Sequence, residues 1–141
     1  MYLTFDEYTI MGGTLPETDF NFLAFDADTF IDWYTFNRLH DLTPDDIPER
    51  VKQCEFFLIK LIQAKMDLLT PQSASGNGIN ANAQIMSMSN DGVSTEYSVL
   101  HADEIYHNSK TEIDEAIKRY LNGVKDSLGR KLLYRGLYPG E

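Results

Sequence analysis

The sequence predicts a mainly α-helical fold: a small bundle of three to four main helices, with a short β-hairpin or loop insertion and an extended C-terminal tail. Three observations predict this class. Apolar residues recur at spacings of three and four along three segments, which is the period of an amphipathic helix. Thr, Pro and Gly-Gly signals of helix ends flank these segments. A serine-rich segment with Asn90-Asp91-Gly92 interrupts the pattern and is typical of a turn between strands.

The length of 141 residues predicts a single domain, 1–141, that can bury a core. We expect a helical core at about 4–69 and 103–123, a hairpin or loop at 70–98 and a tail at 124–141. The composition, 43% hydrophobic and 24% charged, is that of a globular protein. No membrane span or signal peptide is expected, and the single cysteine, Cys54, excludes an internal disulfide.

The net charge of −10 disfavours a groove that grips a phosphate backbone by bulk electrostatics. The charge is uneven along the chain. Residues 1–48 hold ten acids and one base, whereas residues 109–141 hold seven bases and five acids. Such a gradient can steer a head-to-tail contact between copies of the chain, and the alternative is scatter in a small acidic protein.

Two short motifs predict the first two helix starts. Thr4-Phe5-Asp6-Glu7 has the spacing of a capping box, and the short helix that follows should stop at Gly12-Gly13. Thr14-Leu15-Pro16-Glu17 repeats that spacing and should open a helix from about Pro16 to about Phe36.

This second helix carries two apolar stripes on opposite faces, because their starts lie two residues apart, roughly 200° around the helix. The stripes are Phe20, Leu23, Ala27, Phe30 and Tyr34, and Phe22, Phe25, Thr29, Trp33 and Phe36. A helix that is apolar on two faces must be covered twice. One face can pack on the protein's own core and the other on a neighbouring subunit. The alternative is that the first helix and the tail cover the second face.

The third helix should run from about Pro48 to Leu69. It has one apolar face and ends before Pro71. Next, Ile85–Ser89 and Val93–Tyr97 are expected as strands around the Asp-Gly turn. A lone hairpin is marginal in water and would gain by packing on another subunit.

The last helix is clearest from about Ser109 to Leu121, with a start as early as Asp103 possible from the pattern, and Asn122-Gly123 ends it. The apolar and aromatic tail is too short for a core of its own, so it should dock on this chain or on a partner.

Motifs for chemistry are weak throughout the chain. His101, Asp103 and His107 lack metal-ligand spacing, and Gly76-x-Gly78 lacks the context of a phosphate loop. Asp28 and Asp32 are expected on a solvated face, and Cys54 in the core. We therefore predict no catalytic, cofactor-binding or metal-binding residue.

Several short motifs, taken in order along nearly the whole chain, together resemble a known protein family. The opening Tyr2-Leu3-Thr4-Phe5-Asp6-Glu7-Tyr8 is followed by Met11-Gly12-Gly13-Thr14-Leu15 and by the aromatic helix with Phe20-Asn21-x-Leu23 and Ala27. The chain closes with Lys118-Arg119-Tyr120-Leu121 and Leu132-Leu133-Tyr134-Arg135-Gly136. Taken in this order, the sequence resembles the head–tail connector (adaptor) proteins of tailed bacteriophages and of prophages in Gram-positive bacteria.

The resemblance implies a helical protein of the virion that forms a ring, of twelve copies, beneath the portal protein. The ring extends the DNA channel and is a platform for a stopper (head-closure) or tail completion protein. The chain would be assembled in the host cytoplasm and would lie at the head–tail junction, and it can be a monomer in solution. It needs no cofactor, binds no specific nucleic acid sequence and contacts no membrane.

The implied contacts fall on three sets of residues, and intramolecular packing is the alternative for each. Ring contacts are expected at Phe22, Phe25, Trp33 and Phe36. Portal docking is expected at Leu132, Leu133, Tyr134, Arg135, Leu137 and Tyr138. Contact with a tail-side partner or the adjacent subunit is expected at Ile85, Met88, Val93 and Tyr97.

Two functions from other classes stay open. A small acidic enzyme subunit would use Asp28, Asp32 and His40 in a concave pocket. An acidic mimic of nucleic acid that inhibits an enzyme would array its acids on one surface.

Overall fold

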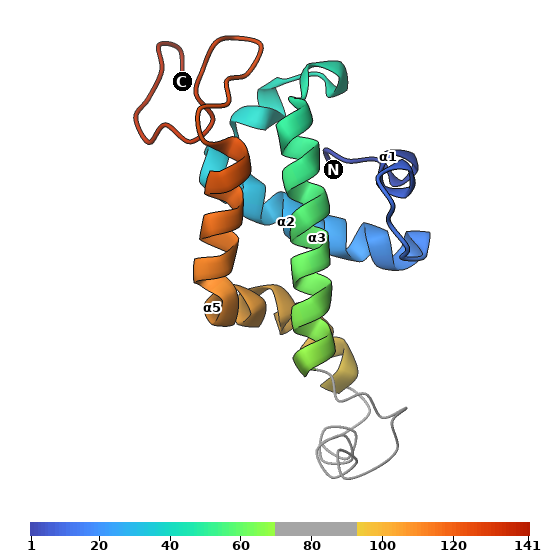
Figure 1. The fold of residues 1–141 in the computed structure, drawn as a ribbon. Coiled ribbons are helices and arrows are strands. Elements are labelled where there is room, and N and C mark those ends of the chain that lie inside the picture. The colour runs from blue at the N-terminus through green and yellow to red at the C-terminus, as the bar shows by residue number, and fades with distance from the viewer. Residues whose placement is uncertain (70–92) are drawn as a thin grey trace. The chain divides into compact units, whose positions relative to one another are not determined.

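The computed structural model describes residues 1–69 and 93–141, with side chains for 1–67 and 106–141. These residues are mainly helical, as predicted (Figure 1). The elements are α1 (Phe5–Ile10), α2 (Glu17–Thr35), two 3₁₀ turns η1 (Arg38–Asp41) and η2 (Pro44–Asp46), α3 (Glu49–Leu69) and α5 (Val93–Leu121). Two compact units form: residues 1–60 with 111–141, and residues 61–110. The expectation of a single domain stays a prediction.

The predicted capping box of the first helix is confirmed. Thr4 Oγ1 accepts from the Glu7 backbone nitrogen at 3.2 Å, and Glu7 Oε2 accepts from the Thr4 nitrogen at 2.9 Å. Gly12, at φ 97°, follows the helix in the left-handed region that glycine tolerates. Tyr8 then packs on Phe20 with ring centroids 4.8 Å apart, so α1 lies against α2.

The second predicted capping box is wrong. The residue that precedes α2 is Pro16, in an extended conformation, and no side chain caps the helix. Proline fixes its own φ near the value that the helix start needs, which makes a hydroxyl cap from Thr14 unnecessary. The helix bounds, Glu17–Thr35, agree with the prediction to within one residue.

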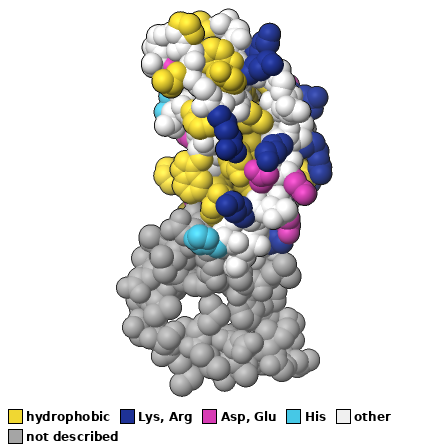
Figure 2. All heavy atoms as spheres, turned by 90° about the vertical axis from the view of Figure 1, so that its left-hand side faces the viewer, with side chains coloured by type: hydrophobic (Ala, Val, Ile, Leu, Met, Phe, Trp, Pro, Cys, Tyr) yellow, Lys and Arg dark blue, Asp and Glu magenta, His cyan; other side chains and the backbone are white. Residues whose placement is uncertain are grey.

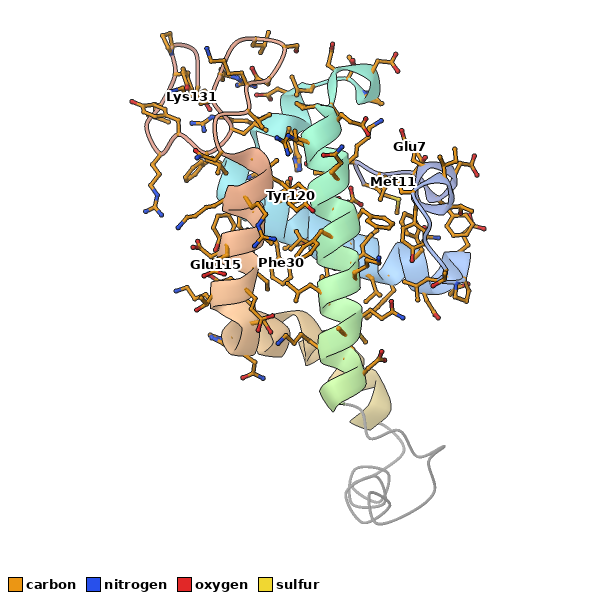
Figure 3. The ribbon with its side chains drawn as sticks, viewed as in Figure 1. Glu7, Met11, Phe30, Glu115, Tyr120 and Lys131 are labelled. Atoms are coloured by element: carbon orange, nitrogen blue, oxygen red, sulfur yellow. The ribbon has the colours of Figure 1, made fainter. Side chains whose placement is uncertain are left out.

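The core of the first unit lies among α2, the first part of α3 and the last part of α5. Phe30 of α2 is fully buried there (Figure 3), and Phe57 of α3 contacts Tyr120 of α5 with ring centroids 5.8 Å apart. Other fully buried side chains of this core are Phe20, Ala27, Ile31, Val51, Leu58, Ile113 and Ile117. These are the apolar positions that the helical periodicity predicts.

Helix α5 corrects the hairpin prediction. Val93–Tyr97, expected as the second strand, forms the start of α5, and the helix runs to Leu121 with non-helical backbone at Ser109. Val93, Tyr97 and Leu100 are spaced by four and three, so the segment also fits a helix, whose hydrogen bonds are all local, whereas a lone hairpin is marginal. The expected first strand and turn, residues 85–92, lie outside the described residues.

The tail begins after Gly123, whose φ of 78° ends α5 as predicted. It has little regular structure: one isolated antiparallel bridge joins Lys125 and Lys131, and Leu132 donates to the Val124 carbonyl at 3.0 Å. The tail therefore depends on side chains from elsewhere in the fold to satisfy its backbone groups.

Candidate functional site

The outer side of α2 is an exposed stripe of aromatic side chains, here called the aromatic face: Phe22, Phe25, Trp33 and Phe36. Their exposed fractions are 43%, 71%, 49% and 48%. Phe20 and Phe30 on the opposite side of the same helix are fully buried. The structure thus places the two predicted stripes as expected, one in the core and one in contact with solvent. An aromatic stripe of this size on a folded chain is typical of an interaction surface.

The C-terminal end of the aromatic face is set by two left-handed residues. Phe36 has φ 55° and Asn37 has φ 58°, which is uncommon for residues with a Cβ atom and costs of order 1–3 kcal/mol each. These two residues turn the chain from α2 into η1. The turn brings the Phe36 ring over the Arg38 guanidinium, with 5.2 Å from Cζ to the ring centroid.

Arg38 is the centre of a second feature, the C-terminal strip of residues 131–141. Its side chain is 1% exposed. Nη1 donates to three strip carbonyls, those of Lys131 (3.2 Å), Leu132 (3.0 Å) and Tyr134 (2.6 Å). Nη2 donates to the Gly136 carbonyl at 2.7 Å. One guanidinium therefore satisfies four backbone oxygens within six residues.

Arg38 also contacts two side chains near the end of the strip, those of Glu141 and Tyr138. Nε donates to Glu141 Oε2 at 3.1 Å, and the Tyr138 ring lies 5.0 Å from the Arg38 Cζ atom. Because Phe36 lies on the same guanidinium, the aromatic face and the C-terminal strip meet at Arg38. The two contact surfaces predicted from the sequence are thus neighbours in space.

Arg130, just before the strip, contacts η1 through the Arg38 carbonyl and the Asp41 carboxylate. Its Nη2 donates to the Arg38 carbonyl at 3.2 Å, and its Nε pairs with Asp126 Oδ2 at 2.7 Å. Nη1 pairs with Asp41 Oδ2 at 3.1 Å. The two arginines therefore cross-link the tail and η1 through main-chain oxygens and carboxylates.

The residues predicted to dock on a portal are divided by this arrangement. Leu132 is fully buried and offers no surface to a partner in this structure, because the strip folds back onto its own core. Tyr134 and Leu137 are exposed by 49% and 81%. Arg135 is also exposed, whereas Leu133 and Tyr138 are half-buried. The Tyr138 ring packs on Tyr134 at 5.0 Å.

The residues predicted for a tail-side contact cannot be placed in the same way. Ile85 and Met88 lie outside the described residues. Val93 and Tyr97 lie in α5, and their side chains are outside the described ones. Their contact role stays a prediction.

Asp28 and Asp32 lie with Glu55 around the N-terminal segment, and the expectation that the pair is solvated is wrong. Leu3 and Tyr2 donate through their backbone nitrogens to Glu55 Oε2 at 2.7 and 3.2 Å. The Met1 amino nitrogen lies 2.8 Å from Asp28 Oδ2. These contacts hold residues 1–3 against α2 and α3, and Leu3 is fully buried.

Asp32 completes this group with two further partners. Its Oδ1 accepts from the Tyr2 hydroxyl, and its Oδ2 lies 2.9 Å from His40 Nε2. The structure thus brings together Asp28, Asp32 and His40, the three residues of the enzyme alternative. Their polar atoms, however, contact residues of the chain's own N-terminal segment and one another.

Burial controls the protonation of this group. Burial and the nearby Asp28 carboxylate raise the pKa of Glu55 to about 9, so this carboxyl is protonated at neutral pH. Burial also raises the pKa of Asp28. Sequence reasoning missed Glu55, although it lies four residues from both Val51 and Ile59, which places it on the buried face of α3.

Burial also raises the pKa of two other side chains, Cys54 and Asp26. Burial raises the pKa of the Cys54 thiol to about 12, which leaves no thiolate near neutral pH and agrees with the predicted core position. Burial raises the pKa of Asp26 to about 6, and its Oδ2 has no hydrogen-bond partner within the described residues.

A pocket of about 670 Å³ lies beside the C-terminal strip rather than beside the acidic group. Its lining residues are Asp41, Leu128, Arg130, Tyr138, Pro139, Gly140 and Glu141. Leu128 at its border is 67% exposed. The pocket is connected to Tyr134 through Tyr138, which lines the pocket and packs on the Tyr134 ring.

Neither a metal centre nor a membrane span is found within residues 1–69 and 93–141. No three His, Cys, Asp or Glu side chains described there could hold a metal ion, and none of the described helices is long and apolar enough to cross a bilayer. Comparisons with protein families, curated proteins and solved structures gave no match for this chain. Function must therefore be inferred from the exposed surfaces.

Proposed function

We propose that this chain is a head–tail connector (adaptor) protein of a tailed bacteriophage or prophage. Twelve copies form a ring beneath the portal protein, extend the DNA channel and carry a stopper or tail completion protein. The chain is assembled in the host cytoplasm, lies at the head–tail junction of the virion and acts by binding, not by catalysis.

The aromatic face is the observation that carries this proposal. The exposed fractions of its four side chains, Phe22, Phe25, Trp33 and Phe36, range from 43% to 71%. Burying a large apolar side chain contributes roughly 1.5–3 kcal/mol, so a neighbouring subunit that covers the stripe gains substantial free energy. A ring needs such a surface on every copy, paired with a different surface on the next copy.

The charge distribution supplies a complementary surface. Figure 2 shows Lys and Arg side chains among hydrophobic ones on the side where α5 and the tail lie. Lys118 and Arg119 of α5 and Lys125 of the tail are exposed. In residues 1–48, which contain the aromatic face, the one base, Arg38, is buried, and the exposed acids are Asp6, Glu17, Asp19, Asp41, Asp45 and Asp46. Opposite charges of this kind steer a heterologous contact and fix its orientation.

The overall acidity suits a channel through which DNA must slide. A net charge of −10 repels phosphates and reduces adhesion of the moving duplex to the ring. No sequence-specific contact with DNA is needed for this role.

The proposal is tested by mixing the full chain with the portal protein of the same phage or prophage. Native mass spectrometry should detect a complex with twelve added copies, and electron micrographs should show an added ring on the portal. A mixture in which the two proteins stay separate at micromolar concentration would contradict the proposal.

Variants of the aromatic face test its role in the ring. Phe25→Ser and Trp33→Ser should lower the number of copies bound per portal while each monomer stays folded. Ile10→Ser is the matched control, because Ile10 is 84% exposed but lies on α1, outside the aromatic face. Equal ring assembly by all three variants would show that the stripe is not the ring contact.

A further inference from the structure

The C-terminal strip is held mainly through its backbone. Helices and sheets satisfy their carbonyl groups internally, but the strip has only the isolated bridge between Lys125 and Lys131 and two short-range backbone hydrogen bonds, from Tyr134 to Lys131 and from Glu141 to Tyr138. Arg38 takes the place of that internal bonding, since its guanidinium binds four strip carbonyls and the Glu141 carboxylate. One side chain that lies far away in sequence therefore makes the largest set of contacts to the backbone of the strip.

Binding by the backbone leaves two large side chains of the strip, Tyr134 and Leu137, on the surface. Leu137 and Tyr134 are exposed by 81% and 49%, although Arg38 beneath them is 1% exposed. Lys131, labelled in Figure 3 within the loops that follow α5, and Arg135, next to Tyr134 in the sequence, are exposed as well. The strip thus carries two exposed apolar side chains and two exposed positive charges.

We infer that Arg38 is a positioning residue that pre-organises the C-terminal strip for docking onto a protein partner. The partner surface that fits is an apolar pocket for Tyr134 and Leu137 with acidic side chains at its border. The inference rests on the proposed function, in which the portal protein is this partner. Ordering the strip before docking removes an entropic cost that a free tail would meet on binding.

A different role for Arg38 would be to restrain the strip, so that the strip had to detach before it could dock. A restraint would hide the side chains that bind, whereas in the strip held by Arg38 only Leu132 is fully buried, and Tyr134 and Leu137 are exposed. Loosening the strip should therefore weaken docking. If the strip instead had to detach before docking, loosening it would strengthen docking.

Hydrogen–deuterium exchange of the full chain tests the positioning without any partner. Arg38→Lys keeps the charge but removes the planar fork that reaches several carbonyls at once. We expect the amides of Leu132 and Tyr134, which are hydrogen-bonded in the strip, to exchange about tenfold faster or more, with α2 and α3 unchanged. Arg50→Lys, at an exposed site on α3, is the matched control. Unchanged exchange in the strip of Arg38→Lys would overturn the inference.

Affinity for the portal protein tests the docking step. Arg38→Lys should bind about tenfold more weakly, because the strip must be ordered again on binding. Leu137→Asp should bind more weakly by a similar factor while the exchange of the strip stays as in the unaltered protein. An equal or higher affinity of Arg38→Lys would overturn the inference.

Gly136→Ala keeps the test decisive if Arg38→Lys fails to fold. A Cβ atom at position 136 would lie 2.5 Å from the Tyr134 ring, so the ring must turn. Weaker portal binding with unchanged helix exchange supports docking through a positioned Tyr134 ring, and unchanged binding contradicts the inference. If the unaltered chain does not bind the portal, the proposed function fails, and the exchange of Arg38→Lys still decides whether Arg38 positions the strip.

Discussion

The aromatic face of α2 and the C-terminal strip both expose large apolar side chains, but for different physical reasons. On α2 the backbone hydrogen bonds are internal to the helix, and the exposed stripe follows from residue spacing alone. In the strip the backbone oxygens are satisfied by Arg38, which lies more than ninety residues away. The first surface is therefore a local property of the sequence, and the second exists only in the folded chain.

The difference has a consequence for how each surface can be altered. A substitution on the aromatic face changes what the surface binds without changing its shape, because the helix remains. The strip loses its shape when a residue outside it changes. We therefore expect binding by the C-terminal strip to be weakened by substitutions at positions, such as Arg38, that do not contact the partner.

The largest expected effect contrasts the two sides of α2. Phe30→Ala should lower the free energy of unfolding by about 3–5 kcal/mol, because Phe30 is fully buried and its removal leaves a cavity. Phe25→Ala, at a site that is 71% exposed, should change it by no more than about 0.5 kcal/mol. Urea denaturation of both variants measures the contrast. Similar losses for the two would show that both faces are packed within one chain.

The next effect concerns the strip. Arg38→Ala should lower the free energy of unfolding by about 2–4 kcal/mol, since buried carbonyls lose their donor and the strip detaches to find water. Arg50→Ala removes the same charge at an exposed position and should change stability little. Equal unfolding curves for these two variants would mean that the strip adds nothing to the fold.

Glu55 sets a pH dependence that the arginine-held strip does not share. Its pKa is raised to about 9 in the folded state, against 4.5 for the unperturbed group. The folded chain therefore binds more protons than the unfolded chain between these values, and its stability falls as pH rises through that window. Glu55→Gln mimics the protonated carboxyl and should raise the free energy of unfolding at pH 8 by about 1–3 kcal/mol.

Urea unfolding at pH 5 and pH 8 measures this difference. The gain from Glu55→Gln should be larger at pH 8, because the native protein then carries the cost of keeping Glu55 protonated. A gain that is equal at both pH values would contradict the raised pKa.

The smallest effect separates two tyrosines of the strip. Tyr138→Phe removes the hydroxyl that accepts from the Lys131 backbone nitrogen at 2.9 Å and should cost about 0.5–1.5 kcal/mol. Tyr134→Phe keeps the exposed ring and should have a smaller effect on thermal unfolding. The reverse order would show that the strip is held through Tyr134.

The sequence predicted the helices well because their signals are local. The Thr4 capping box, the bounds of α2 and α3 and the division of α2 into two faces all follow from spacings of three or four residues. The start of α5 at Val93 was missed because a short segment with Val and Tyr fits either a helix or a strand. The predicted Thr14 cap does not form, because Pro16 precedes the helix and needs no side-chain hydrogen bond.

The remaining site features could not be predicted, for a physical reason that Arg38 and Glu55 illustrate. The partners of Arg38 are backbone carbonyls of residues 131–136. Every residue has such a carbonyl, so the sequence contains no signal that indicates which of them Arg38 binds. Glu55 offered a weak signal, its place on the apolar face of α3, but not the identity of the backbone nitrogens that it binds.

The sequence by itself determined which segments are helical and which of their faces are apolar, because helix formation and amphipathicity are set by neighbours within one or two turns. Only the tertiary structure decided that Leu132 is buried while Leu137 is exposed, and that Phe36 and Tyr138 lie on the same guanidinium. These outcomes depend on contacts between residues about a hundred positions apart, and the chain makes those contacts only after its helices have packed.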